Sequence, residues 1–141
     1  MKRLQKIKPL LLGLSLFSLA WVIVHEAQSA SEMSGFTVSG GVDYDRIAFS
    51  VMLVLASAAL LSSRPGSLAV AAALSSIVFA NVLLRDFWLL AHAAEVPVFS
   101  GRHLSLWWPN LEEGKFLQII LSGVILFVSV VASIRRARSL Q

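Results

Sequence analysis

The sequence predicts an all-α integral membrane protein: a four-helix transmembrane bundle with both the N- and C-termini in the cytoplasm. Three observations predict it, namely the composition, the number of long apolar stretches and the placement of basic residues. Of the 141 residues, 57% are hydrophobic and 14% are charged, whereas a soluble domain carries about a quarter charged residues. At this length we expect a single membrane domain over residues 1–141.

Four stretches are long and apolar enough to cross a bilayer: residues 9–27, 44–63, 67–94 and 111–134. A spanning helix needs roughly 20 mostly apolar residues, because the hydrocarbon core is about 30 Å thick. Pro9 suits the first turn of the first helix, where a missing N–H is tolerated. Each stretch therefore predicts one transmembrane helix.

The segments between these stretches indicate how the helices connect. The short, turn-rich SSRPGS at residues 62–67 predicts an antiparallel hairpin of the second and third helices. Residues 28–42 are rich in Ser and Gly, which predicts a loop. Asn110 and Glu113, after Pro109, have the spacing of a capping box at the start of the fourth helix.

Basic residues mark one side of this bundle. Because four spans cross the bilayer an even number of times, eight basic residues lie on the same side of the membrane: Lys2, Arg3, Lys6, Lys8, Arg64, Arg135, Arg136 and Arg138. No acidic residue falls on that side, so the positive-inside rule makes it cytoplasmic. We expect a multi-pass protein of the plasma membrane, the inner membrane of a bacterium, with the lipid bilayer as its first partner. Nucleic-acid binding is not expected, because the chain has no basic surface domain to carry it.

The first apolar stretch also resembles a secretory signal peptide, because basic residues precede it and the small residues AQSAS follow. It is long for that class, and AQSAS is not a clean cleavage site. We favour an uncleaved membrane anchor. Cleavage would leave three spans and the same orientation for the rest.

The third stretch is longer than the bilayer requires. A helix over residues 67–94 would be about 42 Å long, against a core of about 30 Å. A stripe at helical spacing runs along its second half: Asn81, Arg85, Trp88, His92 and Glu95. Asp86 lies about 100° from that stripe.

Two interpretations of this stripe compete. In one, it lines a polar cavity that opens to the outer side, because ionisable groups within a span usually face protein or water. Arg85 could then reach an acid of another helix, such as Glu26, Asp43 or Asp45. In the other, the stripe is the wetted face of a helix leaving the bilayer. The second interpretation is favoured for His92 and Glu95, and the choice stays open for Asn81, Arg85 and Asp86.

Rows of small residues predict where helices approach each other closely. The third stretch has two such rows, Ala72–Ser76–Ala80 and Ala69–Ala73. Small residues let the backbones of membrane helices pack closely. We favour packing within the hairpin of the second and third helices over an interface with a partner.

His25, His92 and Glu95 are candidate metal ligands at the outer side, since imidazole and carboxylate suit zinc, iron or copper. His25 and His92 could also ligate one haem b. Carboxylate-bridged di-iron bundles, however, use Glu-x-x-His pairs on two helices, and this chain has one His-x-x-Glu. Two interfacial histidines remain the favoured interpretation, and the cofactor stays unknown.

The sequence is compatible with three functions, of which the first is the most favoured and the third the least. The first is a non-enzymatic accessory or structural subunit of a larger membrane complex, with a protein partner or a homo-oligomer expected. The second is a small transporter or channel component that uses the stripe of the third helix. The third is an outer-face metal- or haem-binding protein or a membrane-surface enzyme. The absence of a nucleophile elbow, a phosphate-binding loop and any cysteine disfavours enzymatic activity.

Overall fold

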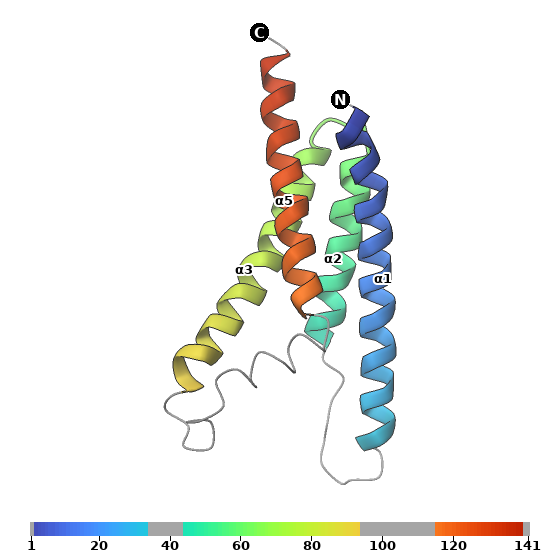
Figure 1. Ribbon diagram of the computed structural model, residues 1–141, viewed down its shortest axis with the longest axis vertical. Helices are drawn as coiled ribbons and strands as arrows, with labels where there is room; N and C mark the ends of the chain where they lie inside the picture. The colour runs from blue at the N-terminus through green and yellow to red at the C-terminus, as the bar shows by residue number, and fades with distance from the viewer. Residues whose placement is uncertain (1, 34–43, 94–114, 140–141) are drawn as a thin grey trace.

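The computed structural model describes residues 2–33, 44–93 and 115–139, with side chains described over residues 5–28, 44–84 and 116–139. Every regular element there is an α-helix (Figure 1): α1 (Lys2–Met33), α2 (Tyr44–Leu61), α3 (Ser67–Ala93) and α5 (Lys115–Arg138). All four helices are long and apolar enough to cross a membrane. The predicted all-helical, multi-pass architecture is confirmed.

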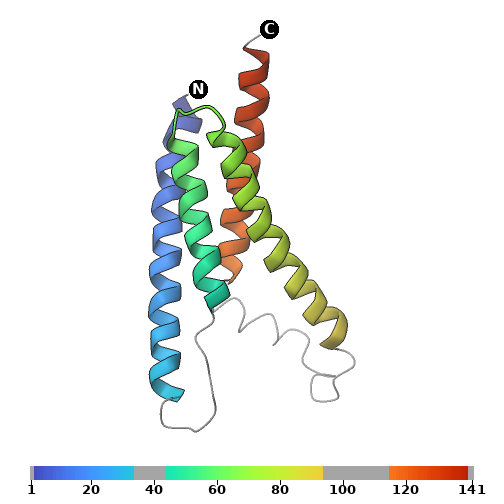
Figure 2. The same cartoon turned by 180° about the vertical axis from the view of Figure 1, so that it is seen from behind.

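The helices form an elongated bundle in which α2 packs against α1 and α3, and α5 packs mainly against α3. The start of α1, the α2–α3 connection and the end of α5 lie together at one end, here called the terminal end (Figures 1 and 2). The opposite end is called the far end. Toward the far end α3 tilts away from the other three helices, and both views show this divergence.

The distribution of apolar and polar side chains differs from that of a soluble protein. Large apolar residues cover the outside, with Leu84 and Phe127 about two-thirds exposed, at 66% and 68%. The interior mixes apolar residues such as Leu53 and Ile125 with many polar ones: Ser15, Ser18, Glu26, Ser50, Ser57, Ser75, Gln118, Ser122 and Ser129. This arrangement suits a lipid solvent, where small and polar residues provide the contacts between helices.

Several helix ends differ from the predicted ones. Helix α1 begins at Lys2, so Pro9 lies inside it rather than in its first turn. Residues 2–8 are mostly good helix formers, which extend the helix upstream although Pro9 removes one backbone hydrogen bond. Helix α1 also continues to Met33, so the first part of the predicted loop is helical. The predicted cap at Asn110 and Glu113 lies outside the described residues.

The α2–α3 connection is the predicted tight hairpin. Gly66 has a φ of +84°, a left-handed conformation that suits a residue without a Cβ. The Ser67 hydroxyl donates to the Ser62 carbonyl at 3.1 Å, and the Ser67 N–H donates to the Arg64 carbonyl at 3.2 Å. These bonds close the turn and set α2 and α3 side by side.

The face of α3 that packs on the bundle is displaced by one residue or two from the predicted rows. Its buried residues are Ala71, Ser75, Val78 and Val82. The predicted Ala69–Ala73 row is exposed, and in the Ala72–Ser76–Ala80 row the first two residues are half-buried and the third is exposed. The four buried positions are three or four residues apart and so share one helix face. The two valines extend this face toward the far end, which a search for small residues alone does not find.

Candidate functional site

The one ion pair among the described side chains joins α1 to α2 near the far end. The Arg46 Nη1 donates to the Glu26 Oε1 at 3.1 Å, and the two side chains are only 11% and 9% exposed. Both residues lie within helices that are candidate membrane spans. Charged groups in such positions are expensive unless paired, and they often mark a site.

Gln118 brings α5 into the same cluster. Its Nε2 donates to the Arg46 carbonyl at 3.1 Å and to the Ser50 hydroxyl at 2.8 Å. An amide group has two N–H donors, so both bonds form at once. Arg46 and Ser50 are one turn apart on α2, which puts both on the face that α5 contacts. We call Glu26, Arg46, Ser50 and Gln118 the far-end cluster.

The far-end cluster is well suited to hold three helices in one arrangement. A buried ion pair gains little over apolar residues of the same shape, because desolvation offsets the attraction. Removing one partner is costly, because the other charge is then left buried. The chemistry of the cluster therefore favours a fixed relative position of α1, α2 and α5 over high overall stability.

A second polar contact lies deeper in the bundle. The hydroxyl groups of Ser15 on α1 and Ser57 on α2 are 2.9 Å apart. The Ser57 hydroxyl also lies 3.5 Å from the Leu11 carbonyl. The hydroxyl of Ser18 is buried and has no hydrogen-bond partner among the described residues. The α1–α2 pair is thus joined by polar groups at two depths.

The other buried serines bond within their own helices. Ser75 donates to the Ala71 carbonyl at 2.7 Å, and Ser129 donates to the Ile125 carbonyl at 2.7 Å. Such bonds satisfy the hydroxyl group without linking two helices. Over residues 67–84, the described side chains of α3 make no hydrogen bond to α1, α2 or α5.

The predicted stripe of α3 is described only in part. Asn81 is exposed, and its Nδ2 donates to the Ile77 carbonyl of its own helix at 2.7 Å. Helix α3 continues through Arg85, Asp86 and His92, whose side chains lie outside the described part of the chain. Glu95 lies outside the described residues. The role of the stripe stays a prediction.

Of the predicted metal or haem ligands, only His25 has a side chain that the structure describes. His25 is half-buried on α1, beside Glu26. Within the described residues, no three His, Asp or Glu side chains are grouped so that they could hold a metal ion. His92 and Glu95 fall outside that search, so the metal and haem hypotheses stay predictions.

Sequence reasoning missed Arg46 and Gln118. Arg46 stands at the start of an apolar stretch on the side where basic residues are rare, and Gln118 is the single amide in the fourth stretch. Both departures from an apolar pattern were visible in the sequence. The sequence suggests Glu26 as one possible acid for Arg85, whereas the structure pairs it with Arg46.

No protein-family model, curated protein or solved structure matches this chain. The features of the molecule that bear on its function are the bundle, the far-end cluster and the surfaces of the helices. In the described residues these features amount to a multi-pass membrane bundle with one buried charged cluster.

Proposed function

We propose that this protein is a non-enzymatic accessory or structural subunit of a larger membrane complex. One observation carries the proposal: the charged cluster buried among the described side chains joins helices to each other. Arg46 on α2 donates to Glu26 on α1 at 3.1 Å, and Gln118 on α5 donates to the Arg46 carbonyl at 3.1 Å. Side chains bonded in this way hold the helices of the bundle in place. The contacts available to a partner therefore lie on the outer surface.

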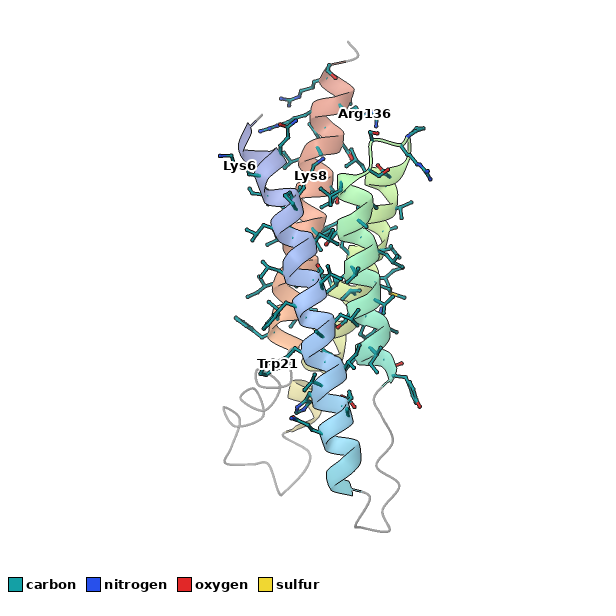
Figure 3. All side chains as sticks on the ribbon, turned by 90° about the vertical axis from the view of Figure 1, so that its right-hand side faces the viewer. Lys6, Lys8, Trp21 and Arg136 are labelled. Carbon is teal, nitrogen blue, oxygen red and sulfur yellow. The ribbon has the colours of Figure 1, made fainter. Side chains whose placement is uncertain are left out.

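That outer surface offers large apolar areas on every helix. On α1, Phe17 and Trp21 are both half-exposed with ring centroids 6.3 Å apart, and Figure 3 shows Trp21 directed away from the bundle. Of the two phenylalanines described on α5, Phe127 is more exposed than Phe116. Lipid tails cover such surfaces, and so do the helices of another subunit, which gain affinity through close packing.

We also propose which way the protein faces in the membrane and which membrane contains it. The terminal end carries the basic residues of α1, of the α2–α3 connection and of α5. A positive end of this kind supports a cytoplasmic location for both termini, in the plasma membrane of a bacterium.

The contacts of α1 also support an uncleaved first helix. Ser15 and Glu26 on α1 both bond to side chains of α2. Loss of α1 would remove both of these contacts, which we expect to destabilise the remaining bundle. We therefore propose that α1 remains part of the mature bundle.

Photo-crosslinking in the native membrane tests the proposal. A photoreactive residue is placed at one lipid-facing position on each helix: Leu10, Leu55, Leu84 and Phe127. An accessory subunit is expected to give one discrete protein adduct from one or two of these positions. Native mass spectrometry of the gently extracted complex should then show a partner of the same mass.

Ser57 is the matched control position, because its side chain is fully buried and should yield only intramolecular products. Adducts with lipid alone from all four exposed positions, together with a bare monomer or a homo-oligomer in the mass spectrum, would overturn the accessory role. That result would direct effort to flux assays on Arg85 and Asp86.

A further inference from the structure

Basic side chains from three separate segments surround the terminal end. Those described are Lys6 and Lys8 of α1, Arg64 of the α2–α3 connection, and Arg135, Arg136 and Arg138 of α5. Figure 3 labels Lys6, Lys8 and Arg136, and shows them at the same end of the molecule. We call these six residues the basic collar.

The charge of the basic collar is not neutralised within the described part of the chain. Five of its side chains are exposed and Lys8 is half-buried, and none forms an ion pair or side-chain hydrogen bond there. The two acids with described side chains, Glu26 and Asp45, lie at the far end. The C-terminus of α5 contributes only about half a negative charge, against three arginines.

Apolar side chains lie directly beside the collar. Ile7 and Leu10 on α1 are exposed, as are Val130 and Ile134 on α5. From Phe116 to Ile134 helix α5 rises about 28 Å, close to the roughly 30 Å hydrocarbon core. The arginines that follow Ile134 therefore stand at the level of the lipid headgroups.

We propose that the basic collar binds anionic phospholipids of the surrounding leaflet. A phospholipid matches both parts of the surface, because its phosphate pairs with the cations and its acyl chains cover the apolar residues. A small free anion or a nucleic acid would use the cations alone. Arg135 and Arg138, three residues apart, share a face of α5, and a guanidinium group can hold a phosphate through two hydrogen bonds.

Binding is measured on the intact protein in a neutral detergent by native mass spectrometry. The probes are dioleoylphosphatidylglycerol and dioleoylphosphatidylcholine, which share acyl chains and differ in headgroup charge. We expect tighter binding of the phosphatidylglycerol, and a loss of about fivefold in its affinity for each arginine neutralised. The test variant is Arg135→Gln/Arg136→Gln/Arg138→Gln.

Two controls accompany the triple variant. Lys115→Gln removes a cation from the opposite end of α5 and should leave the lipid preference unchanged. Arg135→Lys/Arg136→Lys/Arg138→Lys keeps the charge and should retain most of it. Should the glutamine variant fail to fold by circular dichroism, Lys6→Gln/Lys8→Gln tests the same collar from α1.

Three outcomes would overturn the proposal. One is equal affinity of the wild-type protein for the two lipids. Another is an unchanged lipid preference in a folded glutamine variant of the collar, which would mean that other residues cause the preference. The last is full displacement of the lipid by millimolar inorganic phosphate, which would make the collar a site for small anions. None of these outcomes depends on whether the protein has a subunit partner.

Discussion

The far-end cluster and helix α3 are held in the bundle in different ways. At the far end, α1, α2 and α5 are joined by an ion pair and by two hydrogen bonds from Gln118. The described side chains of α3 contribute only packing, through Ala71, Ser75, Val78 and Val82. Near the far end α3 diverges from the three helices that share polar contacts (Figures 1 and 2).

The difference shows what each kind of contact specifies. Helices in a bilayer gain nothing from leaving lipid for another apolar surface, so packing and polar bonds decide their positions. A polar cluster permits few relative positions, because every donor must find its acceptor. Packing of small residues permits a range of tilts, which accords with the inclined path of α3.

Removing one charge of the far-end cluster is expected to have the largest effect. Arg46→Met leaves the Glu26 carboxylate buried without its guanidinium partner, and should lower the free energy of unfolding by about 3 kcal/mol. Adding Glu26→Gln should recover most of that loss, because the remaining groups are neutral. Thermal unfolding in detergent measures both. If the losses of the two single variants simply add in the double variant, the cost does not come from an unpaired buried charge. The control is Asp45→Asn, which changes an exposed acid adjacent to Arg46.

Loss of the Gln118 amide should have an intermediate effect. Gln118→Leu removes the bonds to the Arg46 carbonyl and the Ser50 hydroxyl, and we expect a cost of about 1–2 kcal/mol. Gln118→Glu is an informative second change, since a carboxylate donates neither of these bonds and a protonated carboxyl group donates only one. Chemical unfolding of the variants gives the values. Wild-type stability of Gln118→Leu would show that α5 does not depend on the cluster.

Two glycines, Gly123 on α5 and Gly13 on α1, test how tightly α3 packs against the bundle. A Cβ at Gly123 on α5 would lie 3.5 Å from the Phe79 ring of α3, an ordinary contact, and one at Gly13 on α1 would meet nothing within 4 Å. Both Gly→Ala variants should gain about 0.5–1 kcal/mol from the reduced freedom of the unfolded chain. A clear loss at Gly123 alone, measured by thermal unfolding, would mean that α3 and α5 pack more rigidly than a tilting helix requires.

The smallest expected effect belongs to the serine pair. A double-mutant cycle of Ser15→Ala and Ser57→Ala should give a coupling energy of about 0.6 kcal/mol, the average for such bonds between membrane helices. The same cycle on Ser15 and Ser75 should give none, because Ser75 bonds to its own helix. Coupling above 2 kcal/mol for the first pair would place the main α1–α2 connection there and not at Glu26.

The architecture was predictable because it follows from length and hydropathy. The four spans and the tight turn at Ser62–Ser67 required only local patterns. The buried face of α3 was predicted less well, since helical spacing alone does not say which of several adjacent stripes faces inward. Glu26, Arg46 and Gln118 come from three distant stretches, and no local pattern states which of them meet. Single departures from an apolar pattern, such as Gln118, were the available signal.

The positions of the cluster members along the chain have a consequence for biogenesis. Glu26 precedes Arg46 by 20 residues, whereas Gln118 follows Arg46 by 72. A nascent chain that inserts from its N-terminus therefore contains both charges of the pair well before the amide exists. The first two helices can enter the membrane as a neutralised hairpin, and α5, which is synthesised later, adds the two bonds from Gln118 to α2. Synthesis of α5 thus completes the cluster after α1 and α2 are already joined by the ion pair and by the Ser15–Ser57 contact.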